Sequence, residues 1–299
     1  MGHDHVHDHG GSGARNASRL KWTLALVLAY MAAEVVGGLL ADSLALLADA
    51  GHMLSDAGSL ALALFAMWIA TRPPTSEKTF GYYRTEILAA LANGVTLVLI
   101  SLYIFYEAYE RFQDPPEVTG SLMMGVAVGG LLINLIGLVL LHSGRRESLN
   151  VQGAWLHVLA DAAGSVGAIV AGLLIWWRGW NLADPIVSVL IGVLVLVSSW
   201  TLLKGSVAVL MQSAPRHIDV DRLRDALVAV EGVETVHHLH VWTITSGMES
   251  LAAHVVVDGR RPGREVLAEV RKIIHDRFDI DHCTIQVEPE RFEEPETKV

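Results

Sequence analysis

Six long apolar runs constrain this chain more than any other feature of its sequence. Each run reaches the roughly 20 residues that an α-helix needs to cross about 30 Å of hydrocarbon. Within a bilayer, a helix satisfies its backbone hydrogen bonds inside its own segment. The expected spans are 20–41, 43–70, 82–105, 121–142, 153–177 and 183–210. The sequence therefore predicts a membrane bundle of six transmembrane α-helices.

The composition separates this membrane part from a more polar part. Hydrophobic residues make up 52% of the 299 residues and charged residues only 18%, and the mean hydropathy is +0.41. The long apolar runs end by residue 210. We therefore expect a flexible His-rich N-terminus over 1–19, a transmembrane domain over 20–210 and a cytoplasmic domain over 211–299.

Basic residues predict the orientation, because cytoplasmic loops are enriched in lysine and arginine. One side carries Arg15, Arg19, Lys21, Arg72, Lys78, Arg84, Arg145, Arg146, Lys204 and Arg216, and the other only Arg111 and Arg178. Both termini are then cytoplasmic. The first residues lack the basic region and apolar core of a cleavable signal peptide. We expect an integral protein of the plasma (inner) membrane.

Ionisable residues inside two of the apolar runs predict a functional site, because a charge at bilayer depth is costly. Asp49, His52 and Asp56 are spaced i, i+3 and i+7, so they share one helical face. A second run carries His157 and Asp161, again four residues apart. Two imidazoles and two carboxylates suit a tetrahedral divalent metal such as zinc. The spacing alone allows a metal site or a proton site, and each Asp could instead only hydrogen-bond its neighbouring His.

Three further polar residues lie within the apolar runs, namely Glu34, Asn93 and Asn134. Interhelical hydrogen bonding is the expected role of the two asparagines. Glu34 could carry protons or line the entrance to the site, and we treat it with Asp49 as accessory to the metal site. The fifth helix is expected to begin early, near residues 147–150, so that the two His/Asp pairs reach the same depth.

After Pro215 the pattern indicates a compact α+β domain. Residues 219–230 and 264–278 have helical apolar spacing, and 234–245, 250–257 and 282–287 are typical of strands. The order is αββαβ. His237, His238, His240, His254, His275 and His282 are concentrated here, together with Glu288. Their presence on neighbouring strands is compatible with a second metal site or with ordinary surface histidines.

The net charge, the single cysteine and the N-terminal histidines limit which ligands and partners are expected. The net charge of −10 argues against nucleic acid, and the lone Cys283 excludes internal disulfides and a Cys₄ zinc site. His3, His5, His7 and His9 alternate with other residues near the N-terminus. This tract could collect metal weakly, or it could be a solvated tail without an essential role.

These motifs resemble the cation diffusion facilitator family of divalent-metal/proton antiporters, close to its zinc-transporting branch. The resemblance rests on Ser43–Asp56, Thr79–Glu86, His157 with Asp161, His237–Trp242, the strand with His254 and His282–Glu288, and it covers roughly 20–288. It implies a homodimer with six transmembrane helices and a ferredoxin-like cytoplasmic domain that binds zinc.

The resemblance also assigns residues. It places the transport site at His52, Asp56, His157 and Asp161, with His52 typical of zinc preference, and the cytoplasmic site at His237, His254 and Glu288. Strand alternation disagrees, because it puts His237 on the opposite face from His238 and His240. A β-bulge would reconcile the two, so His240 and His282 are kept as further candidates.

The sequence thus favours secondary export of Zn²⁺, with Cd²⁺ or Co²⁺ as further substrates, in exchange for H⁺. Zinc is expected as the transported substrate and as a structural or regulatory ion, and the bilayer, protons and a second copy as partners. The alternative is a membrane-bound zinc sensor, which would not need a complete ligand set at mid-membrane. The chain contains no His-Glu-x-x-His protease motif and no ATP-binding Gly-x-x-x-x-Gly-Lys-Ser/Thr motif, so neither enzymatic activity nor ATP drive is expected.

Overall fold

The computed structural model describes residues 28–70, 72–142 and 149–289. The chain divides into two compact units. The first unit contains the chain up to Leu62 together with Ala92–Leu202, and the second contains Ala63–Leu91 together with the chain from Leu203.

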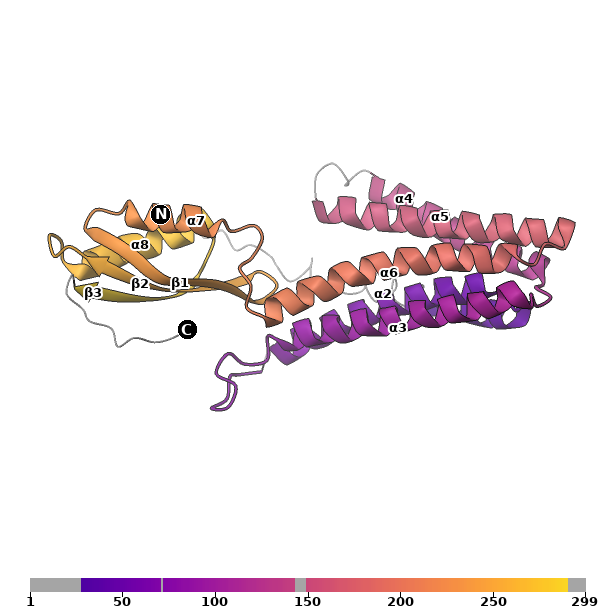
Figure 1. Cartoon of the computed structure of the whole chain (residues 1–299), viewed down its shortest axis with the longest axis horizontal. Coiled ribbons are helices and arrows are strands. Elements are labelled where there is room, and N and C mark those ends of the chain that lie inside the picture. Colours follow the sequence, from indigo (N-terminus) through magenta and orange to yellow (C-terminus); the bar gives the residue numbers. More distant parts are fainter. Residues whose placement is uncertain (1–27, 71, 143–148, 290–299) are drawn as a thin grey trace, which may run out of the picture. The chain divides into compact units, whose positions relative to one another are not determined.

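Helices make up the membrane part (Figure 1). They are Leu28–Ala41, α2 (Leu44–Ala70), α3 (Thr85–Gln113), α4 (Gly120–His142), α5 (Leu149–Arg178) and α6 (Ala183–Leu210). Within the described residues, four stretches are long and apolar enough to cross a membrane, namely Thr85–Gln113, Gly120–Leu140, Val158–Arg178 and Ala183–Leu210. Leu28–Ala41 and Leu44–Ser55 are shorter apolar helices. These helices confirm the predicted α-helical membrane bundle.

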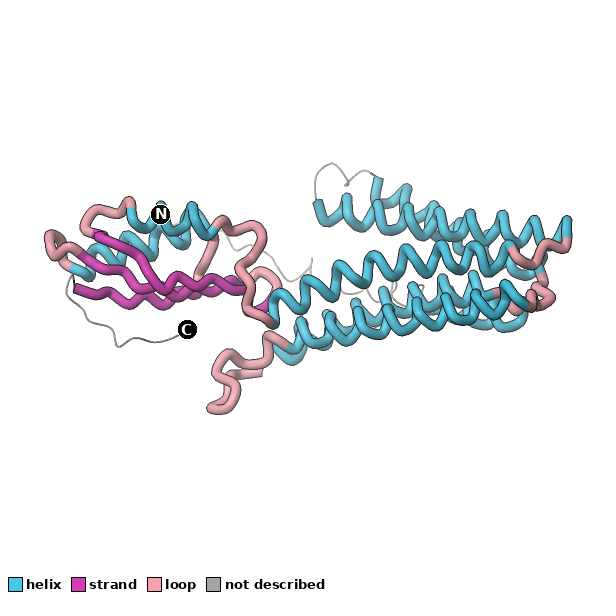
Figure 2. The backbone as a smooth tube through the Cα atoms, in the orientation of Figure 1, coloured by secondary structure: helices cyan, strands magenta, loops and turns pink. Residues whose placement is uncertain are grey.

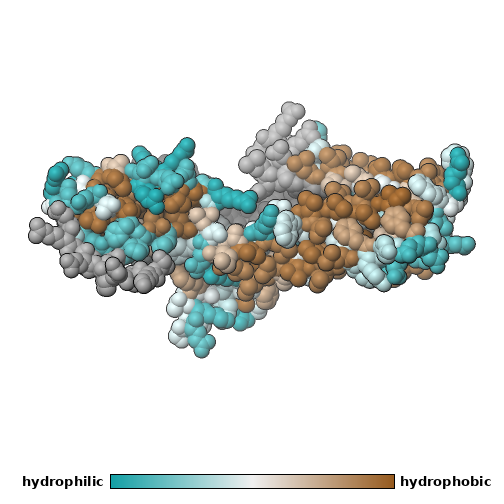
Figure 3. Space-filling view, in the orientation of Figure 1, coloured by the Kyte–Doolittle hydropathy of each residue, from teal (hydrophilic) through white to brown (hydrophobic). Residues whose placement is uncertain are grey.

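The outward surface of these helices is apolar (Figure 3). Large side chains are exposed there, including Val139 at 75%, Leu140 at 73% and Trp177 at 69%. An apolar surface of this extent is compatible with lipid and not with water. The core of the first unit instead contains many alanines, such as Ala45, Ala48 and Ala168. Small residues allow helices in a bilayer to approach closely.

Two helix boundaries bear on the sequence predictions. α5 begins at Leu149, as the depth argument predicted, well before its apolar run. α3 continues to Gln113, eight residues beyond the expected end at Phe105. The added turns are polar on one side and carry i,i+4 bonds, from Tyr106 Oη to Glu110 at 2.9 Å and from Arg111 Nε to Glu107 at 3.1 Å. These pairs extend the helix where apolarity no longer indicates it.

The cytoplasmic domain has the predicted αββαβ order. Its elements are α7 (Val220–Val228), β1 (Val233–Thr245), β2 (Met248–Val257), α8 (Gly263–Phe278) and β3 (His282–Pro289). The sheet order is β1-β2-β3, with β1 antiparallel and β3 parallel to β2 (Figure 2). α8 makes the crossover that a parallel pair requires. Leu223, Val266 and Ile274 on the helices are fully buried in one core with Leu251 and Val255 of β2.

Candidate metal centres

The first candidate centre lies between α2 and α5. His52 of α2 and Asp161 of α5 approach each other, with Nε2 and Oδ1 3.2 Å apart. Their side chains are 17% and 21% exposed. The residues are separated by more than one hundred positions in the sequence, so this contact joins one residue of each predicted His/Asp pair.

A small cavity of about 150 Å³ adjoins this contact. α2, α5 and α6 all contribute to its lining, with Asp49, His52, Ala160, Asp161, Gly164, Ile191, Leu194, Val195 and Ser198. Most of this lining is apolar, and the charged groups come from α2 and α5. A low-dielectric cavity strengthens the attraction of these carboxylates for a cation.

The other two predicted ligands are Asp56 and His157, whose side chains lie outside the described part of the chain. Their backbones are helical, Asp56 on α2 and His157 on α5. Asp56 is four residues from His52, and His157 is four residues from Asp161. Residues four apart lie on one face of a helix, and this spacing is the basis for expecting Asp56 and His157 at the same site. The complete set of four ligands stays a prediction, because two of the four side chains are outside the described residues.

The two accessory residues lie beside this centre. Asp49 is 9% exposed and lines the cavity, and Glu34 is 1% exposed. Tyr30 and Asp49 are the neighbours of the Glu34 carboxyl. The centre therefore contains acidic groups besides the predicted ligands.

Hydrogen bonds between helices support the centre, and they confirm the role expected of the two asparagines. Asn93 of α3 donates to Ser55 Oγ of α2 at 2.9 Å, and Asn134 of α4 donates to Ser165 Oγ of α5 at 3.5 Å. Ser165 in turn donates to the backbone oxygen of Asp161 at 3.1 Å. Both helices that carry predicted ligands are thus bonded to a neighbour close to the cavity.

The second candidate centre lies on the three-stranded sheet of the cytoplasmic domain. The carboxylate of Glu288 on β3 is 3.0 Å from Nε2 of His237 on β1 and 2.8 Å from Nδ1 of His254 on β2. One ligand atom from each of these residues lies within 4.8 Å of the others. In a tetrahedral zinc site with bonds of about 2 Å, two ligand atoms lie roughly 3.3 Å apart. Small shifts of these three side chains would therefore let all of them bind one zinc ion.

β1 contains the β-bulge that we expected from the conflict between strand alternation and the assigned ligands. His237 pairs with His254, but the next paired residue on β1 is His240, opposite Ala252. Between them His238 has a φ of +48°, in the left-handed region. A bulge inserts an extra residue and changes which face the following side chains occupy. His237 pairs with His254 just before the bulge, and the bulge turns His240, opposite Ala252, to the same face of the sheet as His237.

The structure does not bring the two remaining histidine candidates into this cluster. His240 pairs with Ala252, and its ring lies 6.4 Å from that of His238. His282 opens β3 opposite Ser250 and packs edge-on against Phe80, with ring centroids 5.7 Å apart. It is six residues from Glu288 along an extended strand, roughly 20 Å away.

Sequence reasoning missed one neighbour of the cluster. The His238 ring lies 5.2 Å from that of His237 and 5.1 Å from that of His254. Its position follows from the bulge, and the residue alternation of a regular strand could not indicate it.

Sequence reasoning also missed two polar contacts elsewhere. Within the second unit, Glu86 at the start of α3 accepts hydrogen bonds from Thr245, the last residue of β1, and from Ser246 in the turn that follows. Within the first unit, buried Asp184 accepts hydrogen bonds from the first turn of α2. Glu86 lies in the Thr79–Glu86 stretch that carries the resemblance, but no spacing in the sequence indicates its partners.

The apolar helices are those of an integral membrane protein, and His52, Asp49 and Asp161 line a small cavity among them. The αββαβ domain adds a His₂Glu cluster, so both parts of the chain carry groups that can bind metal cations. Residues 20–211 match the cation efflux transmembrane domain, and residues 215–290 match the cytoplasmic domain of cation efflux proteins. The chain belongs to the cation efflux (cation diffusion facilitator) family.

Curated relatives cover nearly the whole chain. It is 47% identical to the metal cation efflux system protein CzcD of Cupriavidus metallidurans, over 96% of this chain and 90% of that protein. It is 45% identical to the cadmium, cobalt and zinc/H(+)-K(+) antiporter of Bacillus subtilis, over 97% and 93%. It is 44% identical to the zinc transporter ZitB of Escherichia coli, over 95% and 92%.

One solved structure is also similar, the metal-bound C-terminal domain of the CzcD transporter. It is 43% identical, with a TM-score of 0.23, and the match covers 24% of this chain and 99% of that one.

Proposed function

We propose that the protein exports Zn²⁺ from the cytoplasm in exchange for H⁺, with Cd²⁺ and Co²⁺ as secondary substrates. The observation that carries this proposal is the contact between His52 and Asp161 at a small cavity between the helices. His52, Asp56, His157 and Asp161 would form the transport site, and Asp49 and Glu34 would assist it. The names of the relatives, which include zinc transporters and a cadmium, cobalt and zinc antiporter, support metal export.

Competition between metal and protons for the same groups accounts for the exchange. A ligand must lose its proton before it binds zinc, so metal binding releases protons. An ordinary imidazole titrates near pH 6.5, close to physiological pH. At the near-neutral cytoplasmic side the site would therefore accept zinc. At a more acidic exterior protonation would expel it, and the protonated site would return.

The cytoplasmic His₂Glu cluster would hold a regulatory zinc ion. Two imidazole nitrogens and one carboxylate oxygen are typical zinc ligands, and three protein ligands leave one position open. The match of residues 215–290 to the cytoplasmic domain of cation efflux proteins supports assembly as a homodimer. The basic loop residues support an orientation with both termini in the cytoplasm, and the bacterial relatives support the plasma membrane.

Zinc transport into proteoliposomes under an imposed pH gradient tests the proposal. Zinc should accumulate only while the gradient lasts, and Asp161→Ala should abolish accumulation because an incomplete ligand set competes poorly with water. Asp114 is an exposed aspartate just after α3. The variant Asp114→Ala is therefore the matched control and should transport normally. If zinc bound the cytoplasmic cluster of the unmodified protein but never crossed the membrane, the sensor alternative would replace the transporter.

A further inference from the structure

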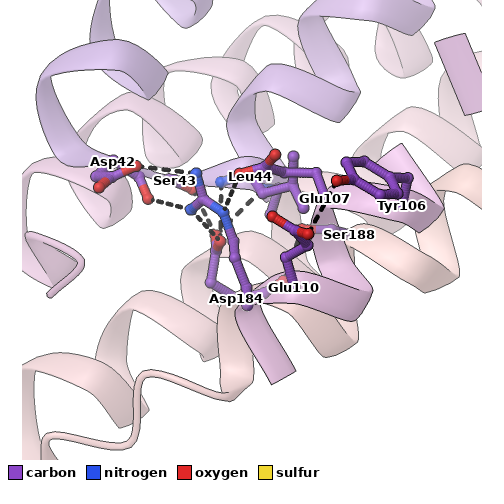
Figure 4. A network of polar contacts seen from close by, with 10 residues as sticks. Asp42, Ser43, Leu44, Tyr106, Glu107, Glu110, Asp184 and Ser188 are labelled. Carbon is purple, nitrogen blue, oxygen red and sulfur yellow. Dashed lines mark hydrogen bonds and ion pairs between the residues drawn. The ribbon is translucent and has the colours of Figure 1, made fainter. Parts of the chain in front are cut away.

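A buried polar network outside both candidate centres joins the first turns of α2 and α6 to the last turns of α3 (Figure 4). Asp184, at the start of α6, is 0% exposed. Its carboxylate accepts hydrogen bonds from Ser43 Oγ at 2.7 Å, from the Leu44 amide at 2.8 Å and from the Ala45 amide at 3.1 Å.

Arg111 of α3 completes the network. Its guanidinium lies 3.6 Å from the Asp184 carboxylate. It also donates to the backbone oxygen of Asp42 at 2.6 Å, to the Asp42 carboxylate at 2.9 Å and to Glu107 at 3.1 Å. Asp42 immediately precedes Ser43, with a φ of +54°. The turn before α2 is therefore bonded to α3, and α2 itself to α6.

The way in which α2 begins is unusual. The first amides of a helix normally bond to a capping side chain within the same segment. Here the Leu44 and Ala45 amides bond to Asp184, about 140 residues further along the chain. Ser43 donates to Asp184 and accepts from the Leu46 amide at 3.3 Å. A carboxylate is favoured at a helix N-terminus by the helix dipole, so the start of α2 is bound specifically to the start of α6.

We call the hydrogen bonds between Asp184 and the start of α2 the clamp. The two helices that it joins, α2 and α6, meet again at the first candidate centre. His52 is eight residues beyond Leu44, about 12 Å along α2. Ile191, which lines the cavity beside His52, is seven residues beyond Asp184, about 10.5 Å along α6. Both helices therefore leave the clamp in the same direction and reach the cavity at the same depth. α6 also follows α5, which carries Asp161, after a short turn from Arg178 to Ala183.

We propose that Asp184 is a positioning residue for metal selectivity. By fixing the axial position of α2 against α6, it sets where His52 stands relative to Asp161. It thereby keeps the site at the dimensions of tetrahedral zinc. This inference rests on the proposed transport function. Cadmium is larger than zinc and tolerates longer ligand distances, so a looser site favours it.

Competition between zinc and cadmium in proteoliposomes tests this role. The measured quantity is the ratio of kcat/KM for Zn²⁺ to that for Cd²⁺, taken on full-length protein that elutes as a folded species. Asp184→Ala should lower this ratio at least about tenfold, since a misplacement of ~1 Å can cost ~100-fold in rate. Asp184→Asn keeps one acceptor oxygen and should lower it less. Glu110→Gln is the matched control, because Glu110 bonds to Tyr106 and is exposed.

A purely structural role would give a different result. Asp184→Ala would then yield less folded protein, but the folded fraction would keep the ratio of the unmodified protein, and the proposal would be overturned. If Asp184→Ala does not fold, Ser43→Ala removes one bond of the clamp and must shift the ratio in the same direction. An unchanged ratio in both Ser43→Ala and Asp184→Asn also overturns the proposal. Failure of the transport function itself would appear differently, as absence of gradient-driven zinc movement in the unmodified protein.

Discussion

Replacing Glu288 by glutamine should remove most of the stabilisation that zinc gives to the cytoplasmic sheet. Glu288 is 3% exposed, and its two oxygens contact His237 and His254. Glutamine keeps the shape and a hydrogen-bonding group, so the metal-free fold should change little. It lacks the negative charge and the second acceptor oxygen that bind a cation.

The expected magnitude follows from mass action. Zinc at 100 times its Kd stabilises the domain by about 2.7 kcal/mol. Loss of second-shell partners weakens metal binding ~10- to 100-fold, so loss of a direct anionic ligand should weaken it at least ~100-fold. The same zinc concentration then equals the new Kd, and the stabilisation falls to about 0.4 kcal/mol.

Hydrogen exchange of the full-length protein in detergent measures this difference. In the unmodified protein, zinc should slow exchange of the most protected amides of β1, β2 and β3 by up to ~100-fold, because exchange follows the free energy of opening. In Glu288→Gln the slowing should be only about twofold. Glu249→Gln on β2, outside the cluster, is the control and should respond like the unmodified protein. Equal slowing in Glu288→Gln would refute Glu288 as a ligand.

Two further predictions concern the transport site. His52→Asp makes the site harder and more anionic, so discrimination against Cd²⁺ or Mn²⁺ should relax; an unchanged zinc/cadmium ratio in competition transport would argue against a filter at this position. Zinc affinity should fall steeply between about pH 7 and pH 5.5, because protons and zinc compete for imidazoles that ordinarily titrate near pH 6.5. At least one proton should be released per zinc, counted by isothermal titration in buffers of different ionisation enthalpy with the cytoplasmic ligands His237 and His254 replaced by alanine. Zero protons released at pH 6 would contradict coupled exchange.

Those parts of the fold that follow from local pattern could be predicted from the sequence. A single segment in lipid can make all its backbone hydrogen bonds internally only as a helix, so the long apolar runs indicate helices almost directly. The early start of α5 at Leu149 followed from matching the depths of two His/Asp pairs. The end of α3 at Gln113 could not be predicted in this way. Its last turns are rich in charged residues, a composition typical of a loop, and the pair of Arg111 with Glu107 stabilises them as helix.

Contacts between distant segments could not be predicted in the same way. Asp184 follows the turn after α5 and would count as an ordinary acidic residue in the first turn of α6. Its bonds to Ser43, Leu44 and Ala45 depend on how two helices pack, and no periodicity in either segment indicates that packing. Glu86 is a similar case, since its partners Thr245 and Ser246 lie about 160 residues away.

The two candidate centres differ in how far the sequence defines them, because they rest on different backbone regularities. On α2, a spacing of four residues places His52 and Asp56 on one face of any regular helix. On the sheet each strand contributes one ligand, so the cluster depends on the register of two strand pairs. His254 pairs with Gln286, and Glu288 is two residues further on the same face of β3. His237 joins them by pairing with His254, just before the bulge at His238. Val236 before the bulge and Val241 after it are both buried in the core. In a regular strand these two residues would face opposite sides, so the bulge lets β1 keep both of them in the core while His237 faces His254.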